Sequence, residues 1–122
     1  MMSKITNLEY RDERRGFDWV VEGQSYSIES NNPLVVVPFK AVDKMIVVEP
    51  ASDDAPHNAV IIDSEGQELA RVQNPEASNG AICFSDAYYV NEDLTLFIAF
   101  SSFQMACVVN SDGKIEKLRE TR

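Results

Sequence analysis

The sequence predicts an all-β domain of about ten short antiparallel strands. Helical periodicity is almost absent, and the one candidate helix, residues 8–15, lacks a good apolar stripe. Short apolar or alternating runs are instead separated by turn residues every eight to twelve positions, which is typical of all-β domains. The chain has 122 residues, which fits a single domain over residues 1–122 with its own core.

The predicted strands follow one another along the whole chain. They are residues 17–21, 25–29, 34–37, 45–49, 59–63, 67–73, 81–85, 94–100, 103–110 and 114–119. The strand at 34–37 lies between Pro33 and Pro38, and proline cannot donate to a ladder, so we expect this strand near the edge of a sheet. The stretches 50–58, 74–80 and 86–93 are predicted loops.

One short pattern occurs twice. Residues 59–66 read AVIIDSEG and residues 106–113 read ACVVNSDG, 47 positions apart. In each turn, Asp or Asn bonds forward to the backbone and Gly takes a positive φ without steric cost. The strand before each turn is apolar throughout, and the strand after it is polar or charged, which predicts an inner strand paired with an outer, half-solvated one. The repeat units span about 43–73 and 92–120.

Such a unit resembles one blade of a β-propeller. The alternative is that any two hairpins with this turn chemistry look alike. The hairpin around Val21 to Gly23 is a candidate for a divergent third piece. This is too little chain for a closed ring, so we expect antiparallel sheets in a half-propeller-like arrangement, with a β-sandwich or a β-barrel as the alternatives.

Charge is the strongest compositional feature. The formal net charge is −9, and residues 45–113 contain eleven acidic residues against one basic residue, Arg71. Such a surface would repel the phosphates of nucleic acids and an anionic membrane, and it would attract a basic protein. The alternative is that the acidity serves solubility alone.

The residues that carry chemistry elsewhere do not form a site here. His57, the single histidine, lies in the loop DDAPHN, which reads as solvated rather than metal-binding. Cys83 and Cys107 are flanked by apolar residues, and the N-terminus has no apolar signal region. We therefore expect two buried, reduced thiols in a cytoplasmic protein, with no catalytic residues, no metal and no cofactor.

Two loops offer candidate contacts for a protein partner. Aromatic side chains among acids on an exposed loop suit a binding hot spot. The alternative is that one tyrosine of the pair packs inward and the other covers a strand end. The candidate partner-binding residues are Asp53, Asp54, Asp86, Tyr88, Tyr89, Glu92 and Asp93.

In size, charge and lack of catalytic residues, the chain resembles the immunity proteins of bacterial contact-dependent growth inhibition systems. This resemblance implies a non-catalytic cytosolic protein that forms a one-to-one complex with a basic toxin domain, for example a ribonuclease, and covers its active site. The alternatives are a small-ligand-binding β domain, which needs an apolar cavity, and an accessory subunit of a larger complex, which leaves a sheet edge unpaired.

Overall fold

The computed structural model describes residues 4–51 and 56–121, and this part of the chain is almost entirely β-structure. Two short 3₁₀ turns, Asp12–Arg14 and Ala77–Asn79, accompany eleven strands. The strands are β1 (Ile5–Tyr10), β2 (Gly16–Val21), β3 (Gln24–Glu29), β4 (Val35–Pro38), β5 (Lys44–Val48), β6 (Ala59–Asp63), β7 (Glu68–Val72), β8 (Cys83–Val90), β9 (Asp93–Ala99), β10 (Gln104–Val109) and β11 (Ile115–Thr121).

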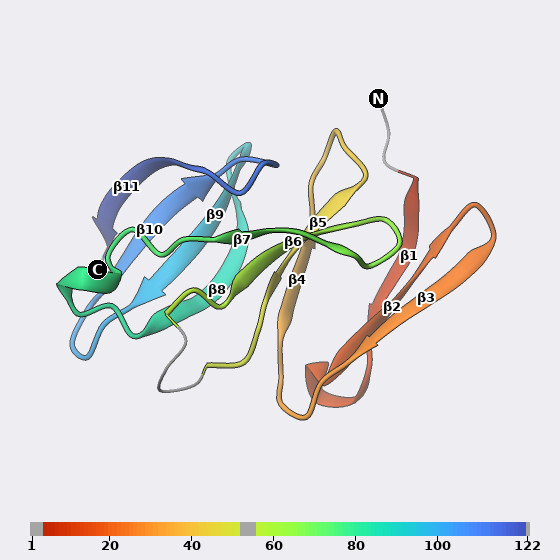
Figure 1. Cartoon of the computed structure of the whole chain (residues 1–122), viewed down its shortest axis with the longest axis horizontal. Helices are drawn as coiled ribbons and strands as arrows, with labels where there is room; N and C mark the ends of the chain where they lie inside the picture. The colour runs from red at the N-terminus through yellow and green to blue at the C-terminus, as the bar shows by residue number, and fades with distance from the viewer. Residues whose placement is uncertain (1–3, 52–55, 122) are drawn as a thin grey trace.

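The strands form three antiparallel meanders, each built from a continuous stretch of chain. We call them the N-terminal sheet (β1-β2-β3), the middle sheet (β4-β5-β6-β7) and the C-terminal sheet (β8-β9-β10-β11). Figure 1 shows the three sheets in a row, with the middle sheet between the other two. The predicted all-β class is confirmed, and the described strands do not close into a barrel.

Burial on both faces explains why the inner strands of the middle sheet, β5 and β6, consist almost entirely of apolar residues. Along β5, Met45 and Val47 face the N-terminal sheet, whereas Ile46 and Val48 face the C-terminal sheet. The side chains of the neighbouring strand β6 alternate between the same two faces. Because successive side chains of a strand point to opposite faces, a strand covered on both sides needs an unbroken apolar run.

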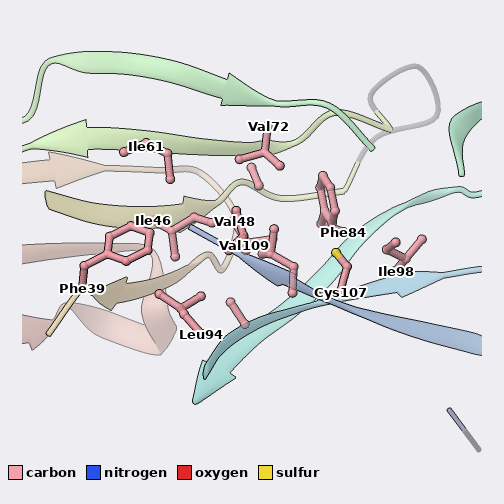
Figure 2. Packing of buried hydrophobic residues seen from close by; sticks show 13 residues of the cluster. Phe39, Ile46, Val48, Ile61, Val72, Phe84, Leu94, Ile98, Cys107 and Val109 are labelled. Atoms are coloured by element: carbon pink, nitrogen blue, oxygen red, sulfur yellow. The ribbon is translucent and has the colours of Figure 1, made fainter. Parts of the chain in front are cut away.

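The core between the middle and C-terminal sheets is the larger of the two clusters. Figure 2 shows Ile46, Val48 and Ile61 of the middle sheet facing Leu94 and Val109 of the C-terminal sheet. Cys107 lies in the same layer. Both cysteines are buried free thiols, as the sequence predicted.

The two echoed turns have the same construction. Asp63 Oδ1 accepts hydrogen bonds from the amides of Glu65 and Gln67, at 2.8 and 2.9 Å. Asn110 Oδ1 accepts from the amides of Asp112 and Lys114, at 2.9 and 3.1 Å. The glycines that follow, Gly66 and Gly113, have φ of +87° and +82°. The predicted turn mechanism is therefore confirmed in both hairpins.

Each repeat unit covers three strands of one four-stranded sheet: residues 43–73 contain β5 to β7, and residues 92–120 contain β9, β10 and all but the last residue of β11. Strand β4 completes the middle sheet, and strand β8 completes the C-terminal sheet. Strand β4, which ends at Pro38, is an edge strand, as the flanking prolines predicted. The third piece around Val21 to Gly23 is the β2–β3 hairpin of the N-terminal sheet.

Residues 8–15, the helix candidate without a good apolar stripe, contain the end of β1 and a single 3₁₀ turn. One local prediction was wrong. Residues 86–93, predicted as a loop, contain the second half of β8 and the start of β9. In β8 the cause is a register shift between Phe84 and Asp86, which brings both Phe84 and Ala87 into the core and breaks the two-residue alternation.

The sheets share a common end, which we call the turn end: residues 22–23, 39–44, 63–67, 91–93 and 110–114. Side-chain hydrogen bonds connect its segments with one another and with β2. Trp19 Nε1 donates to Ser64 O at 2.7 Å, and Lys44 Nζ donates to Ser111 O at 3.2 Å. At the other end, Asn58 bonds the backbone of Phe84.

Candidate binding surface

The β8–β9 hairpin brings together five of the seven candidate partner-binding residues. Tyr88 pairs with Thr95, Tyr89 with Leu94, and Val90 with Asp93 across the hairpin. This hairpin forms one side of the C-terminal sheet (Figure 1). We call the set Asp86, Tyr88, Tyr89, Glu92 and Asp93 the hairpin surface.

The two tyrosines face opposite sides of the sheet. Tyr88 lies on the outer face, 49% exposed, with its ring stacked on Phe97 at a centroid distance of 4.5 Å. Tyr89 packs against the core, and its hydroxyl donates to Pro38 O at 3.1 Å. The burial of Tyr89 raises the pKa of its phenol. The pair therefore supplies one exposed aromatic contact and one fixed ring.

The three acids of the hairpin surface differ in their partners. Glu92 forms an ion pair with Lys40 at 3.2 Å. Asp86 Oδ1 accepts from the amide of Ala87 at 2.8 Å. Within the described part of the chain, neither Asp86 nor Asp93 forms an ion pair. Two carboxylates of the hairpin surface therefore keep an uncompensated charge.

A groove opens at the turn end, between the middle and C-terminal sheets. Its volume is about 270 Å³. The 39–43 loop forms one wall, and the β8–β9 and β10–β11 turns form the other. Apolar side chains and carboxylates both line it, among them Phe39, Val42, Tyr89, Glu92, Asp93 and Glu116.

A smaller hollow of about 90 Å³ lies on the outer face of the C-terminal sheet. Thr95 and Val108 line it, together with Lys117 and Arg119 of β11. Asp93 lines both concavities, so the groove and the outer face meet at this residue.

The other two candidates, Asp53 and Asp54, lie outside the described residues. The described chain resumes at Pro56, whose carbonyl accepts a hydrogen bond from Asn74 Nδ2 at 3.0 Å.

Several residues of the groove carried no signal in the sequence. Lys40 and Val42 come from the short loop after Pro38, and Glu116 comes from the outer strand β11. Lys40 and Val42 precede the hairpin by more than 40 positions and Glu116 follows it by 17, so the packing of the strands and sheets brings them to it.

The reactive residue types serve structural roles. His57 Nδ1 accepts a hydrogen bond from the amide of Asn74 at 2.8 Å. Burial raises the pKa of the Cys107 thiol to about 12, and it also raises the pKa of Cys83. These shifts favour the neutral thiol, which is the opposite of what a nucleophile needs. In the described segments, no group of three His, Cys, Asp or Glu side chains is arranged to hold a metal ion.

Comparisons with known proteins identify the fold. No family model matches the sequence, and no curated protein matches it. A chain in the solved structure of Tne2 in complex with Tni2 has a similar fold, with a TM-score of 0.69 and 12% sequence identity. The match covers 88% of this chain and 77% of that chain. No helix in the described residues has the length and hydropathy to cross a membrane.

Proposed function

We propose that this chain is a non-catalytic cytoplasmic binding protein that neutralises a basic toxin domain, most simply a nuclease, by covering its active site in a one-to-one complex. The observation that carries the proposal is the hairpin surface. It combines an exposed, stacked tyrosine with two carboxylates, those of Asp86 and Asp93, that form no ion pair with any described residue.

Electrostatics support this assignment. The turn end contains seven acidic residues, namely Glu22, Asp43, Asp63, Glu65, Glu92, Asp93 and Asp112, against the three lysines Lys40, Lys44 and Lys114. The net charge of these segments is therefore −4. Clustered like charges attract a partner of opposite charge over about a Debye length, roughly 8 Å at physiological salt.

The aromatic contact supports it too. Tyrosines are enriched among the residues that dominate protein interfaces, because they bury a large rigid area with few rotatable bonds. The ring of Tyr88 is held in place by Phe97, so little conformational freedom is lost when a partner covers it. The chain with a similar fold was itself solved within a two-protein complex, that of Tne2 with Tni2.

The proposal requires that the adjacent upstream reading frame encode a large secreted protein with a basic C-terminal domain. Co-expression of that domain with this chain should restore the growth that the domain alone abolishes. Purification should then yield a one-to-one complex by light scattering. Absence of rescue by the wild-type chain would overturn the assignment.

A control variant separates binding from folding. Tyr88→Ala changes an exposed side chain on the proposed interface, whereas Leu69→Ala changes a side chain on β7, also 49% exposed, that lies outside it. We expect rescue to weaken with Tyr88→Ala and to persist with Leu69→Ala. Equal behaviour of the two variants would place the interface elsewhere.

A further inference from the structure

The groove at the turn end already contains a cation. Lys40 Nζ lies 4.6 Å from the centroid of the Tyr89 ring and 3.2 Å from Glu92 Oε2. The ring is fixed by the hydrogen bond from its hydroxyl to Pro38 O and by its packing against the core. The site is therefore a preformed aromatic face beside a carboxylate, which is how proteins bind ammonium and guanidinium groups.

The lysine that fills this site is weakly held. The side chain of Lys40 is 55% exposed and that of Glu92 is 88% exposed. Lys40 belongs to the 39–43 loop rather than to a strand. Ion pairs and cation–π contacts between exposed groups contribute little, because water and salt compete with both. Lys40 can therefore leave the site without disturbing the sheets that form it.

The groove also has more negative charge than Lys40 neutralises. Glu92, Asp93 and Glu116 line it, and Lys40 is its one cationic lining residue in the described part of the chain. Neither Asp93 nor Glu116 forms an ion pair with another described residue. An incoming cation would find a stacking face, an apolar floor that includes Phe39, and two uncompensated carboxylates.

We infer that Lys40 is an internal stand-in for an arginine of the basic partner, which displaces Lys40 from the Tyr89 ring and Glu92 when the complex forms. Arginine fits better than lysine because its planar guanidinium can stack on the ring and still pair with a carboxylate. This inference rests on the proposed function, since it names the partner group that the hairpin surface receives.

The test uses acetyl-hexaarginine amide as the probe, titrated into the ¹⁵N-labelled chain. Lys40→Met removes the stand-in, and Lys114→Met removes one positive charge at the same end, from a residue that forms no described ion pair. Both variants change the net charge equally. We expect Lys40→Met to bind the peptide about fivefold more tightly than Lys114→Met, with amide shifts in residues 39–43 and 89–93.

A second pair of variants probes the acceptor side. Glu92→Gln should weaken peptide binding several-fold more than Glu65→Gln, because both remove one charge from the turn end but only Glu92 lines the groove. Acetyl-hexalysine amide should bind more weakly than the arginine peptide. Equal affinities for Lys40→Met and Lys114→Met, or amide shifts confined to another region, would overturn the stand-in role.

The two proposals fail in different ways. If the wild-type chain rescues growth but Lys40→Met has no advantage over Lys114→Met, the arginine site is wrong and the proposed function stands. If the peptide results are as expected but no rescue occurs, the groove binds arginine and the toxin partner is wrong.

Discussion

Asn58 connects the middle sheet to the C-terminal sheet, and its replacement is the sharpest test of how the fold is held together. Its side chain is buried, and its amide group donates to Phe84 O at 2.8 Å and to Glu49 O at 2.9 Å. Its oxygen accepts from the Phe84 amide at 2.7 Å. The carboxamide thus satisfies both backbone groups of Phe84 on the side of β8 that faces away from β9.

Asn58→Ala would leave these three backbone groups without their partner. Each buried group left unpaired costs about 1–3 kcal/mol, and the Glu49 carbonyl, which is only partly buried, lies at the low end. We expect a loss of about 3–5 kcal/mol from a total stability of roughly 5–15 kcal/mol. Unfolding entropies scale with chain length, and for 122 residues this loss lowers Tm by about 12–20 °C.

Urea unfolding followed by circular dichroism measures this loss, with Asn79→Ala as the control. Asn79 makes an exposed side-chain hydrogen bond to Glu76, so its replacement should change stability by less than about 0.5 kcal/mol. The urea concentration at the midpoint of unfolding should be lower for Asn58→Ala than for the wild type, and the slope of the unfolding free energy against urea concentration should change little. A loss below about 1 kcal/mol would refute the role of Asn58 as the link between the sheets.

Three further predictions test other parts of the account. The pKa of Cys107 rises from its ordinary value of 9.0 to about 12 in the folded chain, so the unfolded chain releases this proton first as pH rises. The titration of this thiol should therefore lower the free energy of unfolding by about 1.4 kcal/mol between pH 8 and pH 10. In urea titrations of Cys107→Ala, the free energy of unfolding should fall by that much less over the same pH range. An equal fall in the wild type and in Cys107→Ala would contradict the burial of this thiol. Gly66→Ala should lower Tm more than Gly23→Ala, because both glycines have positive φ but only the new Cβ at Gly66 lies 3.3 Å from Trp19; calorimetry showing the reverse order would be inconsistent with this packing. Tyr88→Ala should weaken toxin binding at least about tenfold by calorimetry, with Leu69→Ala unchanged; equal affinities would exclude Tyr88 as an anchor.

The positions of the central strands and of their turns could be predicted from the sequence because each depends on a local pattern of residues. Strands covered on both faces are apolar throughout, and the turns at Asp63 and Asn110 use the same side-chain bonds to the backbone. Both signals are local, so no knowledge of the sheet partners was needed.

The bulged strands were not readable, because a bulge changes the spacing that identifies a strand. In β1, a register shift between Thr6 and Glu9, with Asn7 at φ +53°, brings Ile5 and Leu8 to the same core. Apolar residues three positions apart do not show the two-residue alternation that identifies a strand, and β1 was therefore not predicted. The shift beside Ser85 hid the second half of β8 in the same way.

The hairpin surface was partly predictable. The tyrosines and acids of residues 86–93 were named as a group, and a single hairpin carries them. The groove was not predictable, because Lys40 and Glu116 reach it from other strands through the packing of one sheet against the next.

The most direct test of the central claim is the salt dependence of association with the toxin domain, measured by stopped flow. The wild-type association rate should fall at least about tenfold between low salt and 0.5 M salt, because steering by exposed charges is screened. The variant Asp86→Asn/Glu92→Gln/Asp93→Asn should associate more slowly than the wild type, and its rate should depend less on salt. The control Glu9→Gln/Asp12→Asn/Glu76→Gln, which removes the same charge elsewhere, should behave nearly as the wild type. A wild-type rate that does not change with salt, or equal rates for the two triple variants, would contradict capture through the hairpin surface.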